Sequence, residues 1–117
     1  MNLQKRAIRI IAGTSYCSHT APLFMELNLL MFHQIKLYQT AVVVYKYAHA
    51  LLPSRFDNYF TTGTEIHSHY TRAPRSYCTI QAKSNIKRFS AKYNGPNVWN
   101  LIPANIHEAP NMFLFKK

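Results

Sequence analysis

The chain has 117 residues, and its fourteen Lys and Arg residues against four Asp and Glu residues give a formal net charge of +10 at pH 7. This length fits one domain with a single core, and no run of residues is apolar for long enough to span a membrane. The low charged share of 15%, beside 48% hydrophobic residues, predicts apolar surface that packs against a neighbour.

Two short helices are predicted at the start of the chain. Residues 3–12 place apolar side chains on one side and cations on the other, and Gly13 can end this helix in a left-handed conformation. Thr20 is expected to cap a second helix that carries Pro22 in its first turn. The segment between them is predicted to be a loop.

A long helix is predicted over about residues 31–52, where one apolar stripe recurs every three or four positions until Pro53. The alternative is a strand at residues 42–44, which are three consecutive valines. The length of the stripe favours the helix. A short helical turn at residues 54–60 is expected to fold back onto the core.

Beyond Gly63 the pattern changes from helical spacing to alternation. Strands are predicted near residues 66–72, 77–81 and 87–93. A short helix is then expected to begin at Pro96 and to end before Pro103, with Trp99 packed in the core.

The predicted fold class is therefore α+β: N-terminal helices, one of them long, followed by a small antiparallel sheet and a short helix. Residues 1–60 form the predicted helical part, and residues 61–117 form a basic, β-rich part.

A window without acidic residues runs between Glu65 and Glu108. Its cations alternate with aromatic residues, a combination that suits a polyanion with stackable bases. Nucleic acid is the partner that this pattern favours. The predicted phosphate contacts are Arg72, Arg75, Lys87, Arg88 and Lys92, and the predicted stacking faces are Tyr70 and Tyr77.

The residue types that catalysis needs are scarce. Asp57 is the only aspartate, so the clustered carboxylates of two-metal phosphoryl transfer are missing. His67 and His69 lack an orienting carboxylate nearby in the sequence. Cys17 and Cys78 lack zinc-site spacing and are expected to behave as small hydrophobic residues. We expect no enzyme activity, no metal and no cofactor.

Four segments carry a resemblance to a known family: residues 3–11 (LQKRAIRII), residues 21–27, the pairs His67-Ser68 and Thr71-Arg72, and residues 89–103 with Gly95-Pro96, Trp99-Asn100 and Pro103. Together they resemble the C-terminal end of reverse transcriptases from non-LTR (LINE-type, jockey-like) retrotransposons. The chain departs from that family at His69, Tyr70 and Ile102.

The resemblance implies a non-catalytic fragment of an RNA-directed DNA polymerase, following the thumb and cut short at its end. The catalytic aspartates would lie upstream, and Met1 would be an internal or spurious start. The implied role is to hold RNA template or primed RNA/DNA duplex beside the upstream polymerase domain, in the nucleus or cytoplasm and away from membranes. The alternatives are a structural docking element on the polymerase body and a decayed remnant without a role.

Overall fold

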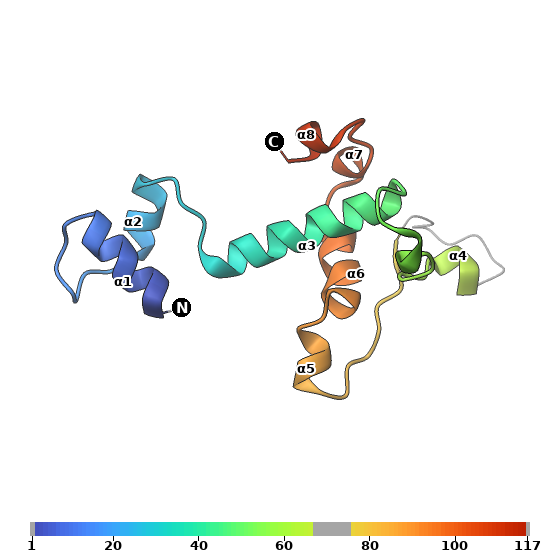
Figure 1. Cartoon of the computed structure of the whole chain (residues 1–117), viewed down its shortest axis with the longest axis horizontal. Helices are drawn as coiled ribbons and strands as arrows, with labels where there is room; N and C mark the ends of the chain where they lie inside the picture. Colours follow the sequence, from blue (N-terminus) through green and yellow to red (C-terminus); the bar gives the residue numbers. More distant parts are fainter. Residues whose placement is uncertain (1, 67–75, 117) are drawn as a thin grey trace. The chain divides into compact units, whose positions relative to one another are not determined.

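The computed structural model of the chain describes residues 2–66 and 76–116. The chain divides into two compact units, Met1–Tyr38 and Gln39–Lys117, and each is described by itself. The helices, labelled in Figure 1, are α1 (Asn2–Ile11), α2 (Ala21–Glu26), α3 (Phe32–Ala48), the 3-10 turn η1 (Ser54–Phe56), α4 (Gly63–Ile66), α5 (Asn85–Arg88), α6 (Ala91–Leu101), α7 (Ala104–His107) and α8 (Met112–Phe115). The described residues contain no β-strand, so the predicted α+β class is wrong and the fold is helical.

The first unit confirms the two predicted short helices, but Thr20 precedes α2 without the predicted side-chain capping hydrogen bond. Ile8 of α1 and Phe24 of α2 are its buried apolar side chains, at 2% and 4% exposure. Gly13 follows α1 with φ +62°, the left-handed conformation expected of a terminating glycine. Gln4 joins α1 to a later segment, because its amide donates to the Leu30 carbonyl at 3.0 Å and accepts from the Phe32 amide at 3.0 Å.

Helix α3 is shorter than the predicted 31–52. It ends at Ala48 because Ala50 takes a left-handed conformation (φ 54°) and the Leu51 amide donates to the Lys46 carbonyl at 2.8 Å, so the chain turns before Pro53. The buried residues of α3 are Ala41, Val42, Val44 and Tyr45. Burial is therefore concentrated in the last turns and is not one stripe along the helix.

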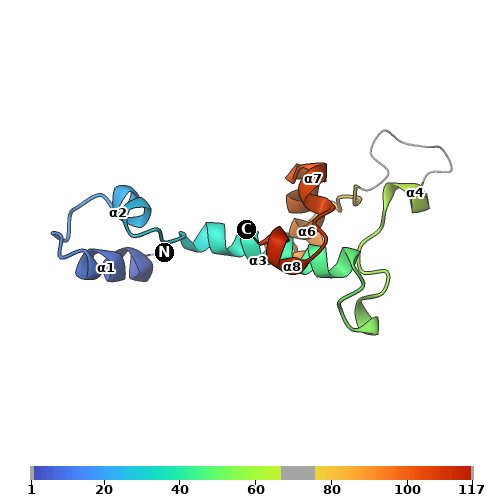
Figure 2. The ribbon, with the colours of Figure 1, turned by 90° about the horizontal axis from the view of Figure 1, so that it is seen from above.

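Aromatic rings dominate the core of the second unit. Tyr45, Phe60, Tyr77 and Trp99 are buried there together with Val44. Helix α6 crosses the C-terminal part of α3 in two views (Figures 1 and 2). Gly95 permits this close approach, since a Cβ atom at that position would lie 2.7 Å from the Phe60 ring and 3.1 Å from Val44.

The strand predicted at 77–81 is reduced to one isolated antiparallel bridge between Thr62 and Tyr77. The Cys78 amide donates to the Thr61 carbonyl at 2.8 Å, and pairing does not continue into a ladder. Of the strand predicted at 66–72, Ile66 belongs to α4, and residues 67–72 lie outside the described part of the chain.

Residues 87–93, which were predicted to form a strand, instead contain the end of α5 and the start of α6. Ser84 caps α5 by accepting from the Lys87 amide, and Ser90 caps α6 by accepting from the Tyr93 amide, each at 3.3 Å. These local hydrogen bonds favour a helix over a strand, although the side chains alternate with a period of two. Pro96 consequently lies inside α6 instead of starting it, whereas α6 does end before Pro103 as predicted.

Candidate functional site

Three of the predicted nucleic-acid contacts, Tyr70, Arg72 and Arg75, lie outside the described residues. Three of the remaining four gather where α5 meets α6. Lys87 and Arg88 close α5, and Lys92 lies in the first turn of α6. With Lys83, which precedes the Ser84 cap, they form a group that we call the basic corner (Lys83, Lys87, Arg88 and Lys92). All four side chains are exposed.

Hydrogen bonds between the two helices fix the backbone of the basic corner. The Ser90 hydroxyl donates to the Lys87 carbonyl at 2.7 Å, and the Asn94 side-chain amide donates to the Arg88 carbonyl at 2.7 Å. Both carbonyls belong to the last turn of α5, where intrahelical partners are lacking. The corner therefore presents its cations from a defined backbone.

Two hollows lie along α6, and the corner contributes one cation to each. A hollow of about 420 Å³ is bordered by Arg88, Tyr93 and Asn97. A second, of about 310 Å³, is bordered by Lys92 and Tyr59, and the Lys92 ammonium lies 5.4 Å from the centre of the Tyr59 ring. A guanidinium at the rim of a polar hollow is suited to a phosphate, which it can bind with two parallel hydrogen bonds.

Tyr77, the fourth described residue of the prediction, is separate from the basic corner. Its ring is 8% exposed and packs against Phe60 and Trp99. Asn100 holds its backbone from both sides, accepting from the Tyr77 amide at 3.1 Å and donating to the Tyr77 carbonyl at 2.9 Å. Burial, followed by the charges of Tyr47 and Glu65, raises the pKa of Tyr77 from 10.0 to about 12.

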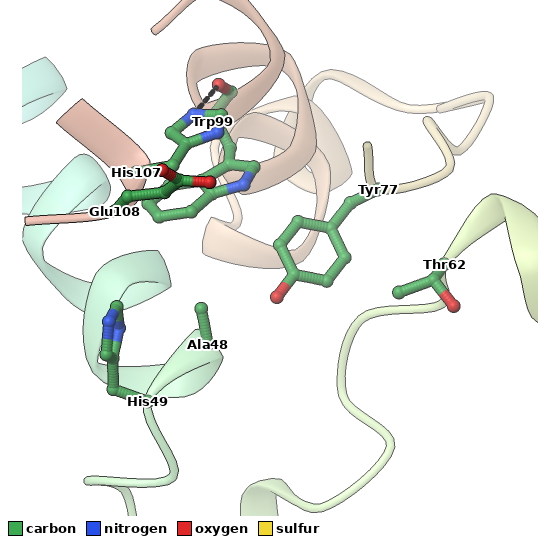
Figure 3. Close-up of a pocket in the computed structure, with 7 residues that line it drawn as sticks. All are labelled: Ala48, His49, Thr62, Tyr77, Trp99, His107 and Glu108. Carbon is green, nitrogen blue, oxygen red and sulfur yellow. Dashed lines mark hydrogen bonds between the residues drawn. The ribbon is translucent and has the colours of Figure 1, made fainter. Parts of the chain in front are cut away.

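Tyr77 faces a cavity of about 400 Å³ that we call the aromatic pocket (Figure 3). It is lined by Ala48, His49, Thr62, Tyr77, Trp99, His107 and Glu108. Tyr77 also lines a second hollow, of about 300 Å³, together with Asp57 and Glu65. Stacking of a base on Tyr77 stays a prediction.

Histidine and tryptophan form one wall of the aromatic pocket. The His107 and Trp99 rings stack with centres 4.1 Å apart and an angle of 2° between them, and His107 Nε2–H donates to the Trp99 carbonyl at 3.0 Å. His49, on the other side of the pocket in Figure 3, donates from Nδ1 to the Tyr45 carbonyl at 3.0 Å. Glu108 also lines the cavity, and its negative carboxylate would repel a phosphate there. The basic corner is the better candidate for a polyanion.

The sequence interpretation missed His107 and Asn100 as partners of the aromatic core. Asn100 acts on a backbone 23 residues away, and His107 reaches Trp99 because α7 folds back beside α6. Neither contact follows from local spacing. The expected burial of Trp99 is confirmed, at 3% exposure.

The described residues provide neither a metal-ligand cluster nor a membrane-spanning helix. Within 2–66 and 76–116, no three His, Cys, Asp or Glu side chains gather closely enough to hold a metal ion. Cys17 and Cys78 are free thiols. None of the helices described is both long and apolar enough to cross a bilayer.

No protein-family model, no curated protein and no solved structure matches this chain. The resemblance to non-LTR reverse transcriptases therefore gains no support from these comparisons, and what it implies is treated below as a proposal.

Proposed function

We propose that this chain binds nucleic acid through the basic corner and performs no chemistry of its own, as expected for the C-terminal segment of a non-LTR retrotransposon reverse transcriptase. The exposed cations of the corner support this proposal. Lys83, Lys87, Arg88 and Lys92 fall within ten consecutive residues, and the sequence has no acidic residue from 66 to 107. A phosphate backbone approaching this face meets no neighbouring carboxylate from that window.

In the proposed mechanism, the cations of the basic corner bind the phosphate backbone of the RNA template or of the primed duplex. Each lysine or arginine that contacts a phosphate releases condensed counterions, which favours binding without reading the base sequence. Long lysine side chains tolerate the varied phosphate positions of a moving template, and Arg88 adds one contact with defined geometry.

A salt titration tests this function. Affinity of the isolated chain for single-stranded RNA should fall steeply as salt rises, with each phosphate contact contributing about 0.7 to the slope of log affinity against log salt. The triple variant Lys87→Ala, Arg88→Ala and Lys92→Ala should bind more weakly and show a flatter dependence. Salt-independent binding by the unaltered chain would contradict the proposal.

A matched control separates the corner from the total charge. The variant Lys5→Ala, Arg6→Ala and Arg55→Ala removes the same charge from exposed positions elsewhere. Its salt dependence should stay close to that of the unaltered chain. Equal losses in both variants would mean that charge anywhere on the chain suffices and that the corner is not the site.

Exposed apolar side chains in the first unit favour a second function, docking onto a larger protein. Leu3, Ile10 and Met25 are 81%, 78% and 79% exposed, and single-chain proteins rarely leave large apolar patches in water. Co-expression with an upstream polymerase region tests it. Improved solubility with unchanged RNA retention would favour docking over nucleic-acid binding.

A further inference from the structure

The hollow bordered by Arg88, Tyr93 and Asn97 combines side chains that suit the separate parts of a nucleotide. We call it the polar hollow. Its volume of about 420 Å³ falls in the range of about 300–1,000 Å³ that is typical of small-ligand pockets. Residues 79–82 line it as well, and Gln81 is among them. One guanidinium, one phenol ring and two side-chain amides therefore line the same cavity.

Hydrogen bonds hold the lining residues of the polar hollow in place. Tyr93 and Asn97 lie four residues apart on α6, a spacing that puts them on the same face of the helix. Asn97 Nδ2 donates to the Tyr93 carbonyl at 3.0 Å, and the Asn94 side chain donates to the Arg88 carbonyl at 2.7 Å. The hollow is therefore formed before a ligand arrives, which lowers the entropy lost on binding.

The amide of Asn97 gives the polar hollow a preference among ligands. Because Nδ2 donates to the helix backbone, Oδ1 lies on the other side of the amide and can accept a hydrogen bond from a ligand. Cytosine and adenine carry an exocyclic amino group that donates to such an oxygen, whereas uracil carries a carbonyl oxygen at the corresponding position. The hollow therefore suits a base with an amino group.

The other two side chains suit the rest of a nucleotide. Tyr93 is partly exposed and lines the hollow, and a phenol ring provides a face on which a base can stack. The exposed Arg88 guanidinium can bind a phosphate with two parallel hydrogen bonds. In a duplex the edges and faces of the bases are already paired and stacked, so the ligand that fits is an unpaired nucleotide.

We propose that the polar hollow binds one unpaired nucleotide of RNA and selects cytosine or adenine over uracil. Tyr93 stacks on the base, Asn97 Oδ1 accepts from its amino group, and Arg88 binds the adjacent phosphate. This inference rests on the proposed function and adds that the basic corner reads one base beside the phosphates that it binds. Tyr93 and Asn97 are not among the contacts predicted from the sequence.

Three oligomers of equal length test base selection: an oligocytidylate, an oligouridylate, and an abasic oligomer with the same sugar-phosphate backbone. Cytosine and uracil have the same ring size, so the two oligomers differ in hydrogen bonding and not in charge. The unaltered chain should bind the oligocytidylate about tenfold more tightly than the oligouridylate. Asn97→Ala should reduce this ratio to about one and leave binding of the abasic oligomer unchanged.

Asn105→Ala is the matched control, because it removes an exposed asparagine of α7 that does not line the polar hollow. It should keep the cytidylate-to-uridylate ratio of the unaltered chain. A variant that only folded poorly would bind all three oligomers more weakly and would keep the ratio, so the ratio separates base selection from stability.

Substitution of Tyr93 tests the stacking face. Tyr93→Leu should weaken binding of both base-bearing oligomers by about tenfold and leave the abasic oligomer unchanged. Tyr93→Phe keeps the ring and should bind all three oligomers as the unaltered chain does. Equal losses for Tyr93→Leu on the three oligomers would contradict stacking on this residue.

Two results would overturn the selective site. They are equal affinities of the unaltered chain for the oligocytidylate and the oligouridylate, and an unchanged ratio in Asn97→Ala. Either result, with salt-dependent binding of all three oligomers, would leave the proposed function in place. Failure of the unaltered chain to bind any of the three oligomers would instead overturn the proposed function.

Discussion

Phe89 and Trp99 lie in the same unit, ten positions apart in the sequence, and they have opposite environments. Trp99 is 3% exposed and stacks on His107, while Phe89 is 72% exposed beside Lys87 and Arg88. Aromatic residues of the acid-free window therefore differ in role, because some are buried in the core and others are exposed to solvent. Trp99 belongs to the aromatic core, whereas Phe89, at the C-cap of α5, leaves most of its surface in solvent.

The largest expected effect tests this contrast in stability. Trp99→Ala should lower the free energy of unfolding by about 3–5 kcal/mol, because it leaves a cavity beneath His107 and Phe115. Phe89→Ala should change it by no more than about 0.5 kcal/mol. Urea denaturation of the two variants measures both values, and similar losses would contradict the assignment of core and corner.

Alkaline pH tests the burial of Tyr77. The pKa of this residue is raised from 10.0 to about 12, so folding favours the neutral phenol. Its contribution to stability is complete below pH 10 and is lost as the pH rises through about 12. Over that window the free energy of unfolding should fall faster than in Tyr77→Phe, by up to about 1.4 kcal/mol per pH unit. Parallel curves for the two proteins would show that Tyr77 is not buried.

Adding one methyl group tests the crossing of α6 and α3. Gly95→Ala places a Cβ atom 2.7 Å from the buried Phe60 ring, and the resulting strain should cost about 1–3 kcal/mol. Near-ultraviolet circular dichroism should report the disturbed rings. Gly13→Ala is the comparison, since nothing lies within 4 Å of its Cβ position and only its φ of +62° opposes alanine. It should leave the aromatic signal unchanged.

The smallest expected effect sharpens the description of the corner. Ser90 both caps α6 and donates to the Lys87 carbonyl, so Ser90→Ala should destabilise the start of α6 by about 1 kcal/mol. Hydrogen exchange at the Tyr93 amide should become faster. The aromatic core should keep its spectrum, because the lost bonds are local. An unchanged exchange rate would show that Ser90 does not hold the corner.

Local signals predicted the first half of the chain well. Gly13 ends α1, Pro22 lies in the first turn of α2, and the apolar run after Met31 forms α3. Each of these depends on backbone preferences within a few residues. The end of α3 was misplaced because the left-handed turn at Ala50 leaves no such signal in the sequence.

The second half was predicted poorly because its local patterns compete. Alternating side chains around Phe89 indicated a strand, and the serine caps at Ser84 and Ser90 indicated helices. A strand also needs a neighbour, and outside residues 67–75 the chain offers Tyr77 only the single bridge to Thr62. Helices satisfy their backbone groups internally, so they form where a sheet has no second strand.

The sequence alone determined the net charge, the acid-free window and the absence of clustered aspartates, since these depend only on which residues are present. Tertiary structure decided which of the aromatic residues became core. Tyr77 is held by Asn100 from 23 residues away, and Phe60 is covered by α6 at Gly95. Such contacts join segments that are distant in the chain, so their free energy cannot be assigned to any short stretch of sequence.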